Sequence, residues 1–323
     1  MIKNKTSNHL IAYFDILGYE NIVNNLQESE EQELITDIKT IIIKLYKMKR
    51  ILQEGFVIKT YSFSDNFLIT MKIDDKENFL EEFYFLVELL QEIQYEIVIN
   101  HGLLIRGGLV KGQLYTGKNF VFGKGLIQVC KIERDIAIFP RIVVDKKLLI
   151  DILPHGCDFI SEDINLVNII FSAFNKASVN EFAVAKGLSK KDYNRLINIG
   201  SNIKLQKDID NNFIINYYQQ IELLRHKKNL NIKNIKEILL THIIFVINNL
   251  NINKNNNKIV EKYLWCCSYY NIFCKENGYP DLTIDIDELR CNYKRKNYDV
   301  FELINKNTDL KKISSPFGQG FVL

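Results

Sequence analysis

The stretch Tyr61-Ser62-Phe63-Ser64-Asp65-Asn66-Phe67-Leu68-Ile69 places Ser, Asp and Asn between two apolar runs. Runs of β-branched and aromatic residues that flank such a break are typical of two strands joined by a hairpin. The earlier stretch Ile11-Ala12-Tyr13-Phe14-Asp15-Ile16-Leu17-Gly18-Tyr19 likewise ends an apolar run on an aspartate. A single aspartate after a strand is commonly an N-cap or a turn residue, but two on neighbouring strands supply hard oxygen ligands. We therefore expect Asp15 and Asp65 to form a magnesium site.

Hydrophobic periodicity extends this hairpin into a complete domain. Apolar runs predict strands over residues 9–14, 56–63, 67–71, 103–109 and 140–145. Helical spacing of apolar residues predicts helices over residues 31–49, 78–95 and 126–137. The glycines at 107, 108 and 112 interrupt one strand and let another backbone or a ligand approach it. This order is that of a ferredoxin-like split βαβ sheet, so we predict an α+β fold with a catalytic domain over residues 1–153.

The second half of the chain has a different pattern. Helical periodicity appears over residues 165–174, 190–199, 213–224, 233–250 and 259–276, with Asn- and Lys-rich connections between them. This pattern predicts a mostly α-helical accessory domain over residues 154–307. Residues 308–323 contain Ser, Pro and Gly and are predicted to form a flexible tail.

Composition places the chain among ordinary soluble globular proteins. It is 47% hydrophobic and 25% charged, with a formal net charge of +3. That charge is too small to indicate a nucleic-acid partner, and a small anionic substrate fits it as well. The polar start, without a signal segment or an apolar run of membrane-spanning length, predicts a cytoplasmic protein with no membrane partner. The six cysteines contain no CxxC pair, so a zinc site is not expected.

Four motifs, in order, resemble the catalytic domain of class III nucleotidyl cyclases. Phe14-Asp15-Ile16-Leu17-Gly18-Tyr19 is similar to the FxDIxGF opening of that family, and Ser64-Asp65 stands where it has a Gly-Asp hairpin. Arg106-x-Gly108-x-x-x-Gly112 is similar to its RIGIHTG strand. Phe122-Gly123, leading into Lys131-Ile132-Glu133, is similar to its late helix. The resemblance covers the first half of the chain.

The positions that read a purine base in this family are substituted here. Tyr61 stands in place of the base-reading lysine, and Lys124 stands in place of the base-reading aspartate. On the late helix, Ile127 replaces the asparagine and Lys131 replaces the arginine. These groups offer a purine edge the wrong pattern of donors and acceptors, whereas a smaller base fits beside Tyr61.

The full pattern looks like the bacterial pyrimidine cyclases of the Pycsar anti-phage defence system. Their motifs are similar to Pro140-Arg141-Ile142-Val143-Val144-Asp145 and, in the helical half, to Lys262-Tyr263-Leu264-Trp265 and Tyr269-Tyr270-Asn271. The resemblance implies conversion of CTP or UTP into cCMP or cUMP after infection, and this product activates a toxic effector. The sequence does not distinguish CTP from UTP.

The resemblance also implies which residues bind metal and phosphate. Asp15 and Asp65, with the Ile16 carbonyl, would bind two Mg²⁺ or Mn²⁺ ions that activate the ribose 3′-hydroxyl and hold the triphosphate. The turn after Asp15 leaves free backbone amides that can donate to a phosphate chain, namely those of Leu17, Gly18 and Tyr19.

Positively charged groups must balance the negative charge that develops on the phosphate oxygens in the transition state. Lys131 and Arg141 are the basic residues best placed by sequence, and Arg106 is either a further phosphate ligand or a structural ion-pair partner. Sites of class III cyclases form between two catalytic domains, so a homodimer is implied in which Asp15 and Asp65 face Lys131 across the interface.

Two other functions remain open. A degenerate cyclase fold that only senses a nucleotide or a partner protein is favoured by loss of the purine-type residues, and retention of both aspartates weighs against it. A polymerase-like nucleotidyl transferase on the same scaffold is less favoured, because such enzymes present paired carboxylates at the hairpin and Ser64-Asp65-Asn66 has one.

Overall fold

The computed structural model describes residues 5–51, 57–73, 79–152, 205–228 and 231–304. It divides into two compact units, which are described separately. The first unit contains Met1–Asp15, Thr40–Tyr95 and Ile105–Gln220. The second unit contains Ile16–Lys39, Glu96–Leu104 and Ile221–Leu323.

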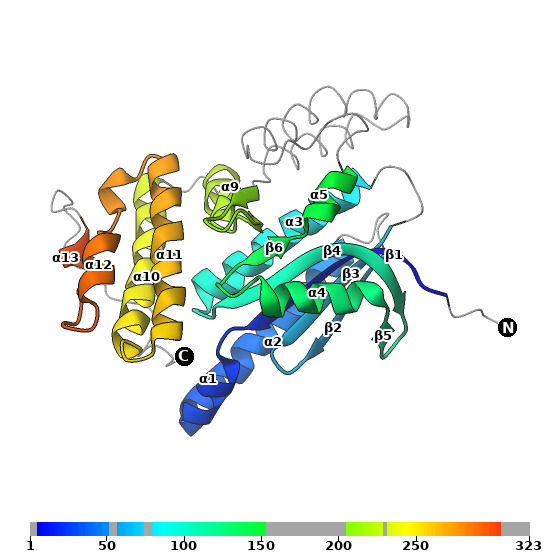
Figure 1. Cartoon of the computed structure of the whole chain (residues 1–323), viewed down its shortest axis with the longest axis horizontal. Coiled ribbons are helices and arrows are strands. Elements are labelled where there is room, and N and C mark those ends of the chain that lie inside the picture. The colour runs from blue at the N-terminus through cyan, green and yellow to red at the C-terminus, as the bar shows by residue number, and fades with distance from the viewer. Residues whose placement is uncertain (1–4, 52–56, 74–78, 153–204, 229–230, 305–323) are drawn as a thin grey trace. The chain divides into compact units, whose positions relative to one another are not determined.

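The first unit is built on a mixed sheet of eight strands among the described residues (Figure 1). The strand order is β2-β3-β1-β4-β6-β8-β7, and β5 pairs with β4. Their bounds are β1 Ser7–Ile16, β2 Ile58–Phe63, β3 Asn66–Lys72, β4 Ile105–Thr116, β5 Val121–Phe122, β6 Ile142–Val144, β7 Leu205–Lys207 and β8 Phe213–Ile215. Strand β6 is parallel to β4, whereas β1 and β2 both pair with β3 in the antiparallel sense.

Helices cover both faces of this sheet. Helix α2 (Glu28–Ile51) contributes Ile42 and Leu45, which lie with Phe67 and Ile69 around a small void on one face. Figure 1 shows α3 (Leu80–Tyr95) behind the sheet and α4 (Lys124–Asp135) in front of it. A short helix, α5 (Lys146–Ile152), follows β6. Because side chains alternate along a strand, residues of each strand pack against the helices on both faces.

Glycines hold α4 close to strand β4. A Cβ atom on Gly112 would lie 2.6 Å from the Gly125 Cα, and one on Gly108 would lie 2.8 Å from Ile132 Cγ2. Neither position therefore accommodates a side chain, which confirms that these glycines allow a close backbone approach. They do not end the strand, because β4 continues to Thr116 and is longer than the predicted 103–109.

The second unit is helical. Its elements are α1 (Tyr19–Asn25), the start of α2, a π-helical turn η1 (Glu96–Asn100), most of α9 (Gln219–Lys228), α10 (Ile232–Ile252), α11 (Asn257–Glu276), the 3₁₀ turn η3 (Pro280–Leu282), α12 (Ile286–Asn292) and α13 (Val300–Leu303). Helix α10 begins with a capping box in which Asn231 and Asn234 each accept from the other's backbone. The long helices α10 and α11 pack on each other and bury their apolar residues.

One of these helices bears on the prediction that no apolar run reaches membrane-spanning length. Among the described residues, α10 is long and apolar enough to cross a bilayer by length and composition. However, 61% of its most apolar window is buried inside the protein, as in the core helix of a soluble protein. The helix is therefore weak evidence for a membrane span, and the cytoplasmic location stays a prediction.

The structure confirms the α+β class and the elements predicted for residues 1–153, with shifted ends. The predicted helices over 233–250 and 259–276 correspond to α10 and α11. The predicted helix over 213–224 is wrong in its first part, because residues 213–215 form β8 and α9 starts only at Gln219. Strands β7 and β8 extend the sheet beyond residue 153, so the predicted domain boundary does not coincide with the edge of the sheet. The predicted helices over 165–174 and 190–199 and the tail 308–323 lie outside the described residues.

Candidate active site

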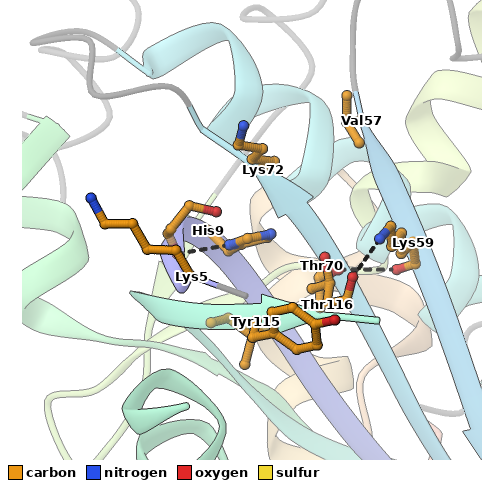
Figure 2. Close-up of a pocket in the computed structure, with 10 residues that line it drawn as sticks. Lys5, His9, Val57, Lys59, Thr70, Lys72, Tyr115 and Thr116 are labelled. Carbon is orange, nitrogen blue, oxygen red and sulfur yellow. Dashed lines mark hydrogen bonds between the residues drawn. The ribbon is translucent and has the colours of Figure 1, made fainter. Parts of the chain in front are cut away.

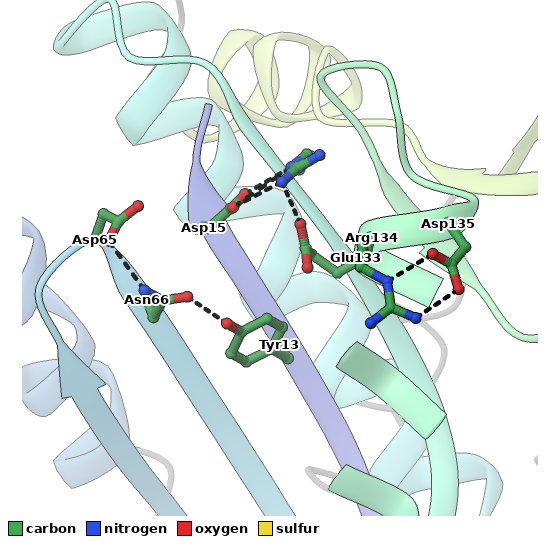
Figure 3. Close-up of polar contacts among 8 residues, drawn as sticks. Tyr13, Asp15, Asp65, Asn66, Glu133, Arg134 and Asp135 are labelled. Carbon is green, nitrogen blue, oxygen red and sulfur yellow. Dashed lines mark hydrogen bonds and ion pairs between the residues drawn. The ribbon is translucent and has the colours of Figure 1, made fainter. Parts of the chain in front are cut away.

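The two predicted metal ligands lie at the same end of neighbouring strands. Ser64 and Asp65 form the two-residue connection between β2 and β3, and Ser64 has a positive φ of 55°. Asp15, near the end of β1, is the direct cross-strand partner of Asn66, the residue after Asp65 (Figure 3). Burial raises the pKa of Asp65, and the negative charge of Asp15 raises it further. The two carboxylates are therefore within electrostatic reach of each other.

A buried ion-pair network surrounds Asp15. The Arg106 guanidinium on β4 donates from Nε to Asp15 Oδ1 at 3.1 Å and from Nη2 to Oδ2 at 3.2 Å. The same Nη2 lies 2.7 Å from Oε1 of Glu133 on α4. Arg106 thus bridges a strand-end carboxylate and a helix carboxylate, and its side chain remains 26% exposed.

Glu133 is the group in this network that responds to pH. Burial, followed by the negative charge of Asp15, raises the pKa of Glu133 to about 7, against the opposing effect of Arg106. Two carboxylates, those of Asp15 and Glu133, therefore share the Arg106 guanidinium.

A chain of hydrogen bonds holds the hairpin aspartate. The Tyr13 hydroxyl donates to Oδ1 of Asn66, and Nδ2 of Asn66 donates to Asp65 Oδ1 at 2.9 Å (Figure 3). Burial, and then the negative charges around it, raise the pKa of Tyr13 to about 12, so its hydroxyl stays protonated and remains a donor. This chain orients the Oδ1 oxygen of Asp65.

The donor set fits a hard divalent cation. Carboxylate oxygens from two strands are the ligands that Mg²⁺ and Mn²⁺ prefer. Within the described part of the chain, no group of three or more His, Cys, Asp or Glu side chains is arranged to hold a metal ion. Since both Asp15 oxygens face Arg106, a cation would bind Asp15 only after the guanidinium moves aside.

Helix α4 places two predicted site residues, the substrate-binding Lys124 and the catalytic Lys131, on the surface. Lys124 is the first residue of the helix and Lys131 lies two residues before Glu133, and both lysines are exposed. Successive residues of an α-helix are turned by about 100°, so Lys131 points away from the side on which Glu133 meets Arg106. Within one chain, Lys131 is not brought together with Asp15 and Asp65.

Arg141 does not fit its predicted role as a phosphate ligand. It is only 1% exposed, its guanidinium pairs with Asp208 and Asp210, and Nη2 donates to the Ile136 carbonyl at 2.9 Å. Two carboxylates already neutralise it, so it ties the loop between β7 and β8 to the start of β6. The prediction is wrong because the partners of Arg141 lie far along the chain.

The remaining predicted residues have mixed outcomes. The Tyr61 hydroxyl donates to the Gly117 carbonyl at 2.7 Å, which fixes its ring on β2 without testing a role in base reading. The amide of Leu17 is not free, because it donates to the Leu104 carbonyl at 2.7 Å. Gly18 caps α1 in the left-handed region with φ 79°, and Tyr19 begins that helix. Ile16, Leu17, Gly18 and Tyr19 belong to the second unit, so their roles as ligands stay predictions.

Sequence reasoning missed three residues of this network, namely Tyr13, Asn66 and Glu133. The sequence motif includes Glu133 without giving it a role. Its position two residues after Lys131 on an amphipathic helix was a signal that it faces inward. Tyr13 lies two residues before Asp15 on the same strand and so on the same face. That spacing could have identified it.

No family model and no curated protein matches this chain. Among solved structures, it is similar to the adenylyl cyclase CyaB from P. aeruginosa, with 12% sequence identity and a TM-score of 0.36. The match covers 46% of this chain and 81% of the other. This similarity is too distant to assign the chain to a family or to transfer an activity to it.

Proposed function

We propose that this protein is a nucleotidyl cyclase that converts CTP or UTP into the 3′,5′-cyclic nucleotide and pyrophosphate. The observation that carries the proposal is the placement of Asp15 and Asp65 at one end of adjacent strands, with Arg106 between the carboxylates of Asp15 and Glu133. The α+β fold, with β3 and β1 adjacent in the sheet, supports it, as does the motif resemblance to class III cyclases.

Each residue of the site has a role in this reaction. Asp15 and Asp65, with the Ile16 carbonyl, would hold two Mg²⁺ or Mn²⁺ ions, and bound ions supply Lewis-acid activation of the ribose 3′-hydroxyl and charge for the triphosphate. With a cation bound to Asp15, the Arg106 guanidinium would be free to donate in a bidentate manner to phosphate oxygens, the geometry that guanidinium groups favour. Tyr13 and Asn66 orient Asp65 throughout.

Selection of a pyrimidine rests on Tyr61. Its hydroxyl is already engaged with the Gly117 carbonyl, so the aromatic ring limits the space for a base and offers no lysine-type donor to a purine. The resemblance to Pycsar cyclases extends the proposal to a messenger role in anti-phage defence, in which the cyclic pyrimidine nucleotide activates an effector.

A second copy of this chain completes the proposed site. Lys131 faces away from the carboxylates of its own chain, so it can stabilise the transition state only in the site of another chain. One turn earlier on α4, Ile127 is 61% exposed, and Phe63 and Phe122 of the same unit are 84% and 69% exposed. Large apolar side chains in water are typical of an interaction surface. We therefore propose a homodimer in which the outer face of α4 meets the carboxylate end of the partner's sheet.

One observation favours the alternative of a nucleotide sensor without catalysis. Arg106 already neutralises Asp15, and an ion pair of this geometry is stable without any metal. If it persists with nucleotide bound, the protein binds a triphosphate through Arg106 and does not cyclise it.

Incubation of the purified protein with ATP, GTP, CTP and UTP separately, each with Mn²⁺, tests the two functions, with products identified by mass spectrometry. We expect cyclic product from CTP or UTP and little from the purines. Asp65→Asn should abolish the product while leaving the circular dichroism spectrum unchanged. Asp287→Asn, an exposed aspartate on α12, is the matched control and should retain full activity.

The outcomes separate the proposals clearly. A folded Asp65→Asn protein with wild-type activity would refute the metal-site assignment. Nucleotide binding by calorimetry without any cyclic product would support the sensor instead, and cyclic AMP or cyclic GMP as the main product would overturn the pyrimidine assignment alone.

A further inference from the structure

A second charged cluster lies on the sheet, at the opposite end of its strands from Asp15 and Asp65. A cavity of about 230 Å³ opens there, and its walls include Lys5, Lys59, Lys72 and His9 (Figure 2). The other lining residues come from the same ends of β1 to β4 and from the segments that precede them. None of the described residues that line the cavity is an aspartate or a glutamate.

The register of the sheet explains why these side chains meet. His9 is the direct cross-strand partner of Lys72, and Lys59 is the direct partner of Thr70. Directly opposed residues point to the same face, and so do residues two apart on one strand. Lys59, Lys72 and His9 therefore share one face of the sheet, and the two lysines are diagonal neighbours.

The pKa of His9 responds to the positive charges of the lysines that line this cavity. Its side chain is 3% exposed, and Nδ1 donates to the Ser7 carbonyl at 2.9 Å. Burial lowers the pKa of His9, and the positive charges of Lys72 and Lys59 lower it further. The charges of both lysines therefore lie within electrostatic reach of the His9 imidazole.

The cavity is separate from the candidate active site. His9 and Asp15 lie six residues apart on one extended strand, a separation of about 20 Å. Its volume is smaller than the roughly 300 Å³ at which pockets for drug-sized ligands begin. An occupant must therefore be small and distinct from a group held by Asp15 and Asp65 of the same chain.

We propose that this cavity binds a small polyvalent oxyanion of the phosphate class. Lysine ammonium groups are compact point charges that commonly bind phosphate oxygens, and a multiply charged anion can bind two of them at once. Lys59 also donates to the Thr116 carbonyl at 2.6 Å, which holds its ammonium group at the cavity wall. The proposal does not depend on the cyclase function.

Calorimetric titration with pyrophosphate in metal-free buffer tests it, because the carboxylate site repels anions when no metal is bound. We expect saturable binding that weakens with rising salt. Lys72→Gln and Lys59→Gln should each weaken it by about tenfold, and the double variant should abolish it. Lys146→Gln removes the same charge from an exposed position on α5 and should bind as the wild type does.

Parallel titration with CTP, also without metal, distinguishes a free anion from the phosphate tail of a nucleotide. Dependence of either titration on Lys59 and Lys72 supports the cavity as the site. Absence of binding at millimolar pyrophosphate, or equal weakening by Lys146→Gln, would overturn the proposal. Because Lys59→Gln also removes a backbone contact, the circular dichroism spectrum of each variant is recorded, and Lys72→Gln decides the outcome if Lys59→Gln misfolds.

Discussion

Arg106 donates hydrogen bonds to both carboxylate oxygens of Asp15, at 3.1 Å from Nε to Oδ1 and at 3.2 Å from Nη2 to Oδ2. The guanidinium occupies the position from which a divalent cation would approach Asp15. Metal binding and this ion pair therefore compete for the Asp15 carboxylate. The free energy of unfolding, measured with and without metal, should show which of the two is present.

Replacing Arg106 by glutamine is expected to destabilise the metal-free protein by about 1–3 kcal/mol. Asp15 and Glu133 would remain close together with their shared cation removed, which is costly for partly buried carboxylates. Addition of Mn²⁺ should raise the melting temperature of the variant more than that of the wild type, since no guanidinium competes. Urea unfolding with EDTA and with Mn²⁺ measures both effects. Arg134→Gln breaks an exposed pair with Asp135 and should change little, whereas equal losses from both variants would contradict the assignment.

Replacing Glu133 by glutamine should change how stability depends on pH. The pKa of Glu133 is about 7 in the folded protein and 4.5 when unperturbed, so its contribution is complete below pH 4.5 and is lost as pH rises through 7. Relative to the wild type, the variant should therefore gain about 1–3 kcal/mol between pH 4.5 and pH 8. Chemical unfolding at the two pH values measures this difference. Glu261→Gln, at an exposed site on α11, should show no such gain, and a flat difference for Glu133→Gln would show that its carboxyl is not perturbed.

Local sequence patterns were enough to predict the carboxylate end of the site. The break at Ser64-Asp65-Asn66 fixes a hairpin, and the apolar run ending at Asp15 fixes a neighbouring strand, so both aspartates reach the same edge. The glycine at 112 likewise predicted a close backbone contact, which helix α4 makes. These features depend on residues near one another in the chain.

The features that sequence did not predict depend on distant pairings. Arg141 is buried by Asp208 and Asp210, whose position next to β6 no local pattern encodes. Strands β7 and β8 have three residues each, which is too few for an alternating pattern to be recognised. In addition, β8 falls within the helical pattern of residues 213–224. The inward position of Glu133 depends on the rotation of α4, which its packing against β4 sets.

Tyr13 is expected to act as a positioning residue for Asp65. Tyr13→Phe removes the hydroxyl that donates to Asn66. The Asn66 side chain is then no longer held in the orientation in which it donates to Asp65. Loss of such an outer contact typically weakens metal affinity by about tenfold or more. Activity measured as a function of Mn²⁺ concentration should therefore show a raised half-saturation point, with the fold unchanged. Tyr61→Phe also removes one hydroxyl from the same face and should leave the Mn²⁺ dependence as it is, so a shared shift in both variants would contradict a specific role for Tyr13.

In the second unit, His101 is expected to stabilise the fold below pH 9. A hydrogen bond to Asp37 at 2.9 Å, followed by the Glu96 carboxylate 3.8 Å from Nε2, raises its pKa from 6.5 to about 9. Its stabilisation is complete below pH 6.5 and is lost as pH rises through 9. His101→Gln should cost about 1–3 kcal/mol at pH 6 and much less at pH 9.5, as measured by urea unfolding. The same loss at both pH values would mean that packing, and not charge, is what the imidazole contributes.

Mixing two inactive variants tests whether active sites are shared between copies. Asp15→Ala removes a proposed metal ligand and Lys131→Ala removes the proposed transition-state cation, so each homodimer should be inactive. In a heterodimer both lesions fall in one site, and the other site is built from an intact Asp15 and an intact Lys131. With random pairing at equal amounts, half of the dimers are mixed, so about a quarter of wild-type activity should return. Asp15→Ala mixed with Asp65→Ala should recover nothing, because both residues belong to the same half of each site. Mass spectrometry of differently tagged chains verifies the exchange, and verified heterodimers without activity would remove Lys131 from the catalytic site.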